Sequence, residues 1–130
     1  MGPIVVVFAG EYDVSCRAQF RRELGRLASK PALILDFSEV TYLDSTSVTE
    51  LLRLNHRRAE ANFERETIVV RTPLLRRLFA ILQLDRVFNV VADLDDALGR
   101  RAEPAQIEYA FSGTDPTLPA PDDFEAVPAH

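Results

Sequence analysis

The chain has one cysteine, one lysine and five glycines among its 130 residues, and these scarcities exclude several classes of protein. Cys16 has no second cysteine with which to form an internal disulfide, and no histidine near it at metal-ligand spacing. The glycines are dispersed, with no Gly-x-Gly-x-x-Gly or Walker-type loop to surround a phosphate. The apolar run over 4–9 is too short to span a bilayer or to act as a signal peptide. We therefore expect a soluble cytoplasmic protein without a cofactor.

Residues that would support catalysis are also sparse. The two histidines are His56, in an arginine-rich helical pattern, and His130 at the last position, and neither stands next to a serine or the cysteine. The acidic run over 93–96 lacks the glycine and the distal glutamate of a calcium-binding loop, so it is better explained as the start of a helix. These patterns predict no catalytic residue and no metal site, and we expect that the protein is not an enzyme.

A phosphorelay receiver domain is a separate alternative, because Asp36 and Asp44 are both expected near strand ends. Such a domain needs an acidic pair after its first strand, an aspartate after its third strand and a lysine further on. The only lysine, Lys30, lies at the end of the first predicted helix. The receiver alternative is therefore rejected.

Charge divides the chain near residue 101. Residues 1–101 carry 15 basic and 14 acidic side chains, a balance that predicts no general attraction to nucleic acid or to anionic lipid. Residues 102–130 carry six acidic side chains, no Lys or Arg, and five of the eight prolines. We therefore predict one domain over 1–101 and an acidic, proline-rich tail over 102–130 that is partly disordered or draped on the surface.

Residues 107–111 stand apart within this predicted tail, because apolar and other side chains alternate there as Ile-Glu-Tyr-Ala-Phe. The pattern predicts either an edge strand or a segment that docks on a partner. An exposed edge strand favours self-association, so a homodimer stays open.

Four short apolar runs predict buried strands over 4–8, 32–37, 67–70 and 87–91. Because these runs are continuous rather than alternating, we expect a sheet that helices cover. Three stripes at spacings of three and four residues predict helices between the strands, and a fourth, short helix begins at about Asp93. The stripes are Phe20, Leu24, Leu27 and Ala28; Val48, Leu51, Leu52 and Ala59; and Leu74, Leu75, Leu78, Phe79 and Leu82. The order predicts an α/β sandwich with a four- to five-stranded sheet and four helices.

Helix boundaries and surface charge agree with this prediction. Pro73 is suited to the first position of the third helix, and Asn62 to the end of the second. The arginines of the helical patterns are expected in solvent, namely Arg21, Arg22, Arg57, Arg58, Arg76 and Arg77.

Hydroxyl and acidic side chains precede the second helical stripe. Asp44, Ser45, Thr46 and Ser47 are each suited to cap the helix, and Ser47 with Glu50 forms a reciprocal capping pair in sequence. Local pattern alone therefore favours a capping role for these residues.

Several segments, in order, resemble the STAS domain family, of the anti-sigma factor antagonist type. They are Gly-Glu-Tyr-Asp at 10–13, Leu-Asp-Phe-Ser-Glu-Val at 35–40, Leu-Asp-Ser-Thr at 43–46, Thr-Pro-Leu-Leu-Arg-Arg-Leu-Phe at 72–79 and Leu-Asp-Arg-Val-Phe at 84–88. The likeness covers about residues 4–100. It implies a STAS-like α/β sandwich, and a regulatory protein that binds an anti-sigma factor with serine-kinase activity and is released when that kinase phosphorylates it.

Carried onto this sequence, the resemblance implies that Ser45 is the phosphoacceptor, with Thr46 and Ser47 as alternatives. It also implies that Asp13, Asp44, Ser45 and Thr46 contribute to partner binding. A phosphate adds about −1.5 to −2 charges beside Asp44 while the helix start favours an anion, so we expect binding to change and the fold to persist.

Ser47 departs from the family pattern, which has glycine at this position. A side chain there either hinders the approach of a kinase or competes with Ser45 as the acceptor. The departure keeps open a second hypothesis, a STAS accessory subunit of a transporter or signalling complex that works without phosphorylation.

Overall fold

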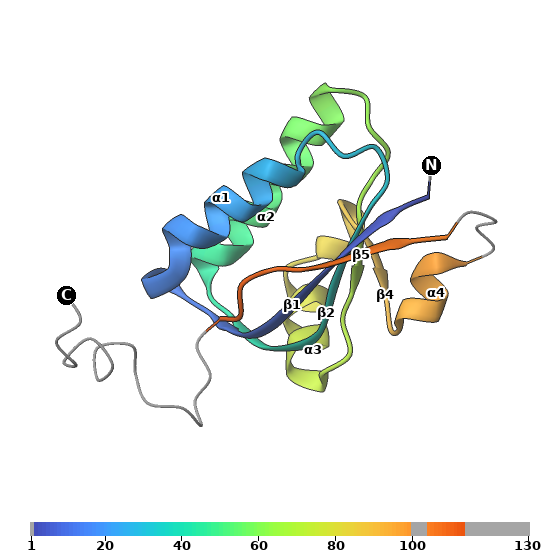
Figure 1. The fold of residues 1–130 in the computed structure, drawn as a ribbon. Helices are drawn as coiled ribbons and strands as arrows, with labels where there is room; N and C mark the ends of the chain where they lie inside the picture. The colour runs from blue at the N-terminus through green and yellow to red at the C-terminus, as the bar shows by residue number, and fades with distance from the viewer. Residues whose placement is uncertain (1, 100–103, 114–130) are drawn as a thin grey trace, which may run out of the picture.

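The computed structural model describes residues 2–99 and 104–113, which form an α/β sandwich (Figure 1). The elements are β1 (Ile4–Tyr12), η1 (Val14–Cys16), α1 (Arg17–Leu27), β2 (Leu33–Leu43), α2 (Ser45–Glu60), β3 (Thr67–Val69), α3 (Pro73–Ile81), η2 (Leu84–Arg86), β4 (Asn89–Val91), α4 (Leu94–Leu98) and β5 (Gln106–Tyr109). The five-stranded sheet and its α-helices confirm the predicted fold class.

The sheet is parallel throughout, with the strand order β4-β3-β2-β1-β5. Its two central strands, β1 and β2, are also its longest, at 9 and 11 residues. They end together, because Tyr12 pairs in register with Leu43. The residues that follow these strands, Asp13 and Asp44, therefore lie at the same edge of the sheet.

The two faces of the sheet pack against different helices. One face, with Val6 and Leu35, packs against α1, α2 and α3 in the main core (Figure 1). The opposite face, with Val5 and Ile34, packs against α4 in a smaller cluster. Burial on both faces explains why these strands are continuously apolar.

The strand ends differ from the prediction. β1 and β2 continue to Tyr12 and Leu43, well beyond the apolar runs over 4–8 and 32–37. The extra part of β2 buries only every third residue, Val40 and Leu43, so no continuous apolar run marks it. The predicted strand over 87–91 is shorter, because its first residues follow η2 and pairing begins at Asn89.

The helix boundaries are confirmed, and four positions of the helical stripes are wrong. Pro73 occupies the first turn of α3, and Asn62 follows α2 with a left-handed φ of 63°. Leu52, Ala59, Leu74 and Leu82 are exposed rather than buried. Leu52 and Leu74 each stand one position from a buried leucine, and one position turns a helical side chain by about 100° away from the core.

Part of the predicted tail belongs to the sheet, since β5 pairs with β1 from Gln106 to Tyr109. This is the edge-strand alternative for residues 107–111. Ile107 and Tyr109 are exposed on this outer strand, and self-association there stays a prediction. Gly113 follows with its amide hydrogen-bonded to the Ala9 carbonyl, and a Cβ at Gly113 would lie only 2.2 Å from the Glu11 carbonyl oxygen. Residues 102–103 and 114–130 of the predicted tail lie outside the described residues.

Tyr12 joins β1 to the segment that follows β5. Its buried hydroxyl accepts a hydrogen bond from the Ala9 amide and donates one of 2.7 Å to the Phe111 carbonyl. Its ring packs edge-on against Phe111 and Phe8. Burial raises the pKa of Tyr12 to about 12, although backbone hydrogen bonds lower it in part. The phenol is therefore held in its neutral form.

This raised pKa predicts a pH dependence at the alkaline end. The folded chain keeps the Tyr12 proton where the unfolded chain, at an ordinary pKa of 10.0, loses it, so the free energy of unfolding falls as pH rises from about 10 to 12. Urea unfolding at pH values across this interval measures the fall. Tyr12→Phe should have lower stability at neutral pH but a shallower alkaline decline, and an equally steep decline in both proteins would contradict the assignment.

Arg58 corrects the prediction that the helix arginines lie in solvent, because only 1% of it is exposed. Its guanidinium donates to the carbonyls of Lys30, Pro31 and Glu64, and its Nε lies 3.8 Å from the buried carboxylate of Glu66. Burial raises the pKa of Glu66 and lowers that of Arg58, so desolvation outweighs their mutual attraction. Arg58 thus fixes the end of α2 to two loops.

Replacing Arg58 tests this role against its exposed neighbour. Arg58→Met removes the partner of a buried carboxylate and of three carbonyls, so we expect a loss of about 3–5 kcal/mol in the free energy of unfolding. Arg57→Met, at an exposed position of the same helix, should change it by about 0.5 kcal/mol or less. Chemical denaturation of both variants gives the comparison, and equal small losses would show that Arg58 is dispensable.

Candidate functional site

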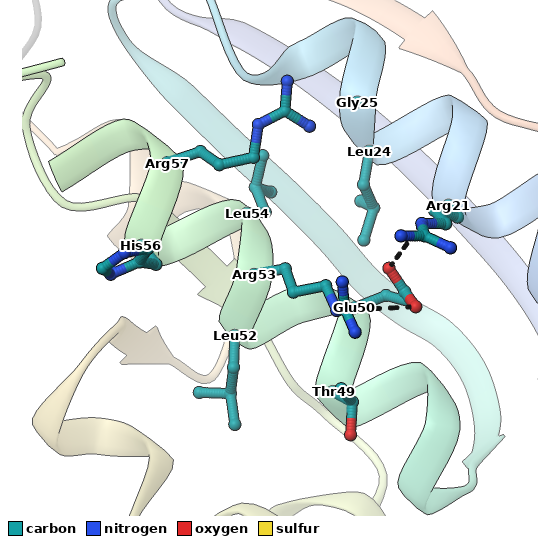
Figure 2. A pocket seen from close by; sticks show the side chains of 10 residues that line it. All are labelled: Arg21, Leu24, Gly25, Thr49, Glu50, Leu52, Arg53, Leu54, His56 and Arg57. Atoms are coloured by element: carbon teal, nitrogen blue, oxygen red, sulfur yellow. Dashed lines mark ion pairs between the residues drawn. The ribbon is translucent and has the colours of Figure 1, made fainter. Parts of the chain in front are cut away.

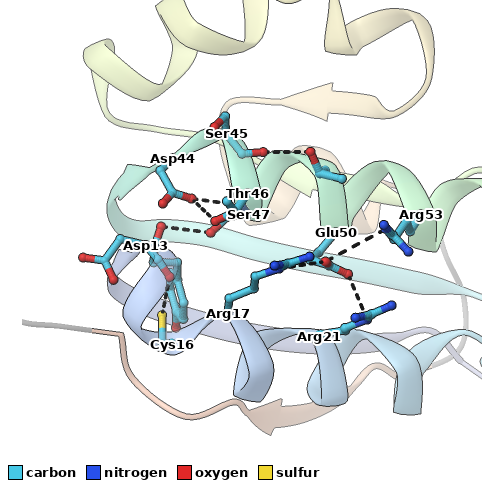
Figure 3. Close-up of polar contacts among 12 residues, drawn as sticks. Asp13, Cys16, Arg17, Arg21, Asp44, Ser45, Thr46, Ser47, Glu50 and Arg53 are labelled. Atoms are coloured by element: carbon cyan, nitrogen blue, oxygen red, sulfur yellow. Dashed lines mark hydrogen bonds and ion pairs between the residues drawn. The ribbon is translucent and has the colours of Figure 1, made fainter.

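The predicted site residues meet where β1 and β2 end and α2 begins (Figure 3). The Asp44 amide donates to the Tyr12 carbonyl at 3.2 Å, which continues the register of the two strands past their last pair. Asp13 follows Tyr12 directly, so the structure brings Asp13 and the start of α2 together at one edge of the sheet.

Asp44 is the residue that caps α2. Its backbone is extended, and its Oδ1 accepts hydrogen bonds from the Ser47 amide at 2.9 Å and from Thr46 Oγ1 at 2.7 Å. Partial burial raises the pKa of Asp44, but these hydrogen bonds lower it by more, so it lies below its ordinary value. The carboxylate is therefore charged at neutral pH and held in one orientation.

Ser45 is the first residue of α2, and its side chain is exposed to solvent. Its carbonyl accepts a hydrogen bond from Thr49 Oγ1 in the next turn. Thr46 is half-buried, with its hydroxyl donated to Asp44. The hydroxyl that the fold presents most openly at this helix start is therefore that of Ser45.

Ser47 points inward, with 1% of its surface exposed. Its hydroxyl donates to the Tyr12 carbonyl at 2.9 Å, across 35 positions of the sequence. The reciprocal capping pair predicted between Ser47 and Glu50 is wrong, because Asp44 caps the helix and the Glu50 carboxylate turns toward α1. Ser47 is thus a structural link between β1 and α2.

Glu50 lies at the centre of a cluster of arginines that sequence reasoning missed (Figure 3). Its carboxylate is buried, and it lies 3.6 Å from the Nε atoms of Arg17 and Arg21 and 4.0 Å from that of Arg53. Glu50 Oε2 has no hydrogen bond among the described residues. One buried carboxylate therefore faces three half-exposed guanidinium groups, which leaves net positive charge between α1 and α2.

A sequence signal for this cluster existed. Arg17 and Arg21 are four apart on one helix, and Glu50 and Arg53 are three apart on the next, so each pair shares a helix face. Which faces meet depends on how α1 packs on α2, and no local pattern gives that.

Asp13 shapes the turn after β1. Its Oδ1 accepts hydrogen bonds from the amide and hydroxyl of Ser15, and its carbonyl accepts from the amide and the thiol of Cys16. Burial raises the pKa of the Cys16 thiol, and Cys16 packs against the main core. This turn therefore stands beside Asp44 as an ordered surface.

The described part of the chain contains neither a candidate metal site nor a helix that could span a membrane. Among residues 2–99 and 104–113, no three His, Cys, Asp or Glu side chains gather as they would to hold a metal ion. Over the same residues, none of the helices has the length and apolar character that crossing a membrane requires.

Comparisons with known proteins give the family of the chain. The family model of the STAS domain matches residues 1–97, and the chain belongs to this family. It is similar to the solved structure of an anti-sigma factor antagonist from Mycobacterium paratuberculosis, with a TM-score of 0.60, 29% identity, and coverage of 72% of this chain and 82% of that one. A second solved structure, the anti-sigma factor antagonist SpoIIAA in its unphosphorylated form, has a TM-score of 0.49, 19% identity, and coverage of 67% and 92%. A comparison with curated proteins gives no match.

Substitution of Asp44 separates capping from charge. Asp44→Ala should lower the free energy of unfolding by about 1 kcal/mol at neutral pH. Asp44→Asn keeps a capping oxygen, so it should lower the free energy of unfolding by much less. Because the folded pKa of Asp44 is depressed, its charge stabilises the fold above the ordinary value of 3.8, and that stability is lost as pH falls through the folded pKa. Urea unfolding at neutral and acid pH should show the wild type and Asp44→Asn converging in acid; equal losses for both variants at neutral pH would refute the capping role.

Proposed function

We propose that this chain is an anti-sigma factor antagonist-like regulatory protein, without enzymatic activity, that binds a serine-kinase-type anti-sigma factor or a related signalling partner in the cytoplasm. The observation that carries the proposal is an exposed serine at the first position of α2, directly after the capping aspartate. Family membership and the antagonist from Mycobacterium paratuberculosis support it.

Among the three hydroxyls at this helix start, Ser45 is the proposed phosphoacceptor. Thr46 donates its hydroxyl to Asp44, and the Ser47 hydroxyl is buried against the Tyr12 carbonyl. Phosphorylation of Ser47 would require breaking that buried contact. The inward direction of Ser47 also means that its side chain leaves the approach to Ser45 open, although glycine is usual at this position in the family.

Partner binding is proposed on the surface formed by Asp13, Asp44, Ser45 and Thr46. A phosphate on Ser45 adds about −1.5 to −2 charges beside a carboxylate that is already ionised. The amides of the first turn of α2 favour an anion, so the domain stays folded. A partner surface that fits a neutral hydroxyl would have to desolvate or repel the new charge, and the complex would weaken.

The test is phosphotransfer and binding with a candidate kinase-type anti-sigma factor and ATP. Mass spectrometry should locate the phosphate on Ser45, and Ser45→Ala should abolish labelling while retaining binding. Ser45→Asp should weaken binding by roughly tenfold or more, which equals about 1.4 kcal/mol.

Ser29→Asp is the matched control, because Ser29 is an exposed serine beyond the end of α1 and should leave binding unchanged. Unchanged binding by both Ser45 variants would refute the proposal. A complex that contains a membrane protein, and whose stability does not change when ATP is added, would instead support the accessory-subunit hypothesis. In that hypothesis the same helix start contacts its partner without phosphorylation.

A further inference from the structure

A groove runs between α1 and α2 and extends to Thr49, one helical turn from Ser45 of the surface proposed for the partner (Figure 2). It has a volume of about 520 Å³. α1 contributes Arg21, Leu24 and Gly25, and α2 contributes Glu50, Arg53, Leu54 and Arg57 on the side that faces α1. Gly25 is part of the groove lining, and a Cβ there would make an ordinary contact, 3.7 Å from an Arg57 guanidinium nitrogen.

The groove combines apolar and basic surface. Leu24 and Leu54 form its largely buried apolar floor, and Leu52 is exposed on the side of α2 away from α1. Arg21, Arg53 and Arg57 supply positive charge, and the one carboxylate, Glu50, is buried beneath them. Its ion pairs with Arg21 and Arg53, at 3.6 and 4.0 Å, are longer than hydrogen bonds, so the guanidinium donors stay available to another acceptor. The chemistry suits an acidic peptide segment that carries an apolar side chain.

The chain itself contains such a segment beyond its described residues. Residues 122–125 read Asp-Asp-Phe-Glu, three acids around one aromatic side chain, and residues 114–130 contain no Lys or Arg. Charge complementarity therefore matches this segment to the groove.

The position of Gly113 places the groove within reach of residues 122–125. Gly113 lies against the backbone of Glu11, near the end of β1 and close in sequence to the start of α1 at Arg17. From Arg17 to Gly25 the helix rises about 12 Å. The nine residues from 114 to 122 span up to about 30 Å when extended. The connection is therefore long enough to bring residues 122–125 round α1 to the groove.

We propose that residues 122–125 of this chain dock in the α1–α2 groove, with their carboxylates on the arginine rim and Phe124 on the leucines. The tail then covers the arginines around Glu50 and leaves Ser45 exposed. The proposal is independent of any phosphorylation, because it concerns only where this segment binds.

Paramagnetic relaxation in the full-length chain tests the contact. A spin label is placed at Ala126→Cys in a Cys16→Ser background, which leaves all the acids in place, and amide signals are recorded by NMR. Signals of residues 21–25 and 52–57 should be strongly attenuated at low salt. They should recover in 1 M salt, where the screening length falls to about 3 Å.

Variants that change the charge of the groove or of the tail segment supply the matched controls. Arg57→Glu should restore the attenuated signals, and so should the triple variant Asp122→Asn, Asp123→Asn, Glu125→Gln, which leaves the folded domain untouched. Arg76→Glu, at an exposed position of α3, should not restore them. Attenuation that is absent, that maps elsewhere, or that survives the triple variant would overturn the proposal. Attenuation seen only between labelled and unlabelled copies in a mixed sample would also overturn it, in favour of a second copy as the occupant.

Discussion

Tyr12 is the residue on which the arrangement of this site depends. Its carbonyl accepts hydrogen bonds from the Asp44 amide and the Ser47 hydroxyl, which fixes the start of α2 against the end of β1. Its hydroxyl bonds to Ala9 and Phe111, which fixes the segment after β5 to the same strand. One buried side chain and its own peptide group therefore hold together three parts of the chain that are far apart in sequence. Contacts within the chain alone form the candidate surface.

This construction divides the hydroxyls of the helix start by role. Ser47 and Thr46 hold the helix in place, and Asp44 caps it, so their polar atoms are already used. Ser45 stands in the same turn with its side chain in solvent. A modification at Ser45 therefore changes the charge of the surface without removing a contact that stabilises the fold. The cluster of Arg17, Arg21 and Arg53 around Glu50 gives the adjoining helix pair the opposite charge.

The sequence was sufficient to predict the α/β sandwich, the order of its elements and the location of the helix start, because buried parallel strands and amphipathic helices carry strong local patterns. It failed where tertiary packing decides. Arg58 belongs to an arginine-rich pattern typical of an exposed face, yet the loops at Lys30 and Glu64 enclose it. Ser47 and Glu50 fit a capping pair locally, but the meeting of α1 with α2 and of α2 with Tyr12 redirects both side chains. Polar residues that serve long-range contacts look the same in sequence as those that face solvent.

The central claim is that the start of α2 is a preformed surface on which phosphorylation of Ser45 changes charge and leaves the fold in place. The most direct measurement is an NMR comparison of the full chain with and without a genetically encoded phosphoserine at position 45. The account predicts amide shift changes confined to the turn at Asp13 and the first two turns of α2, with β1, β2 and the Tyr12 contacts unchanged. Changes that spread through the central strands and the Phe111 segment would contradict it.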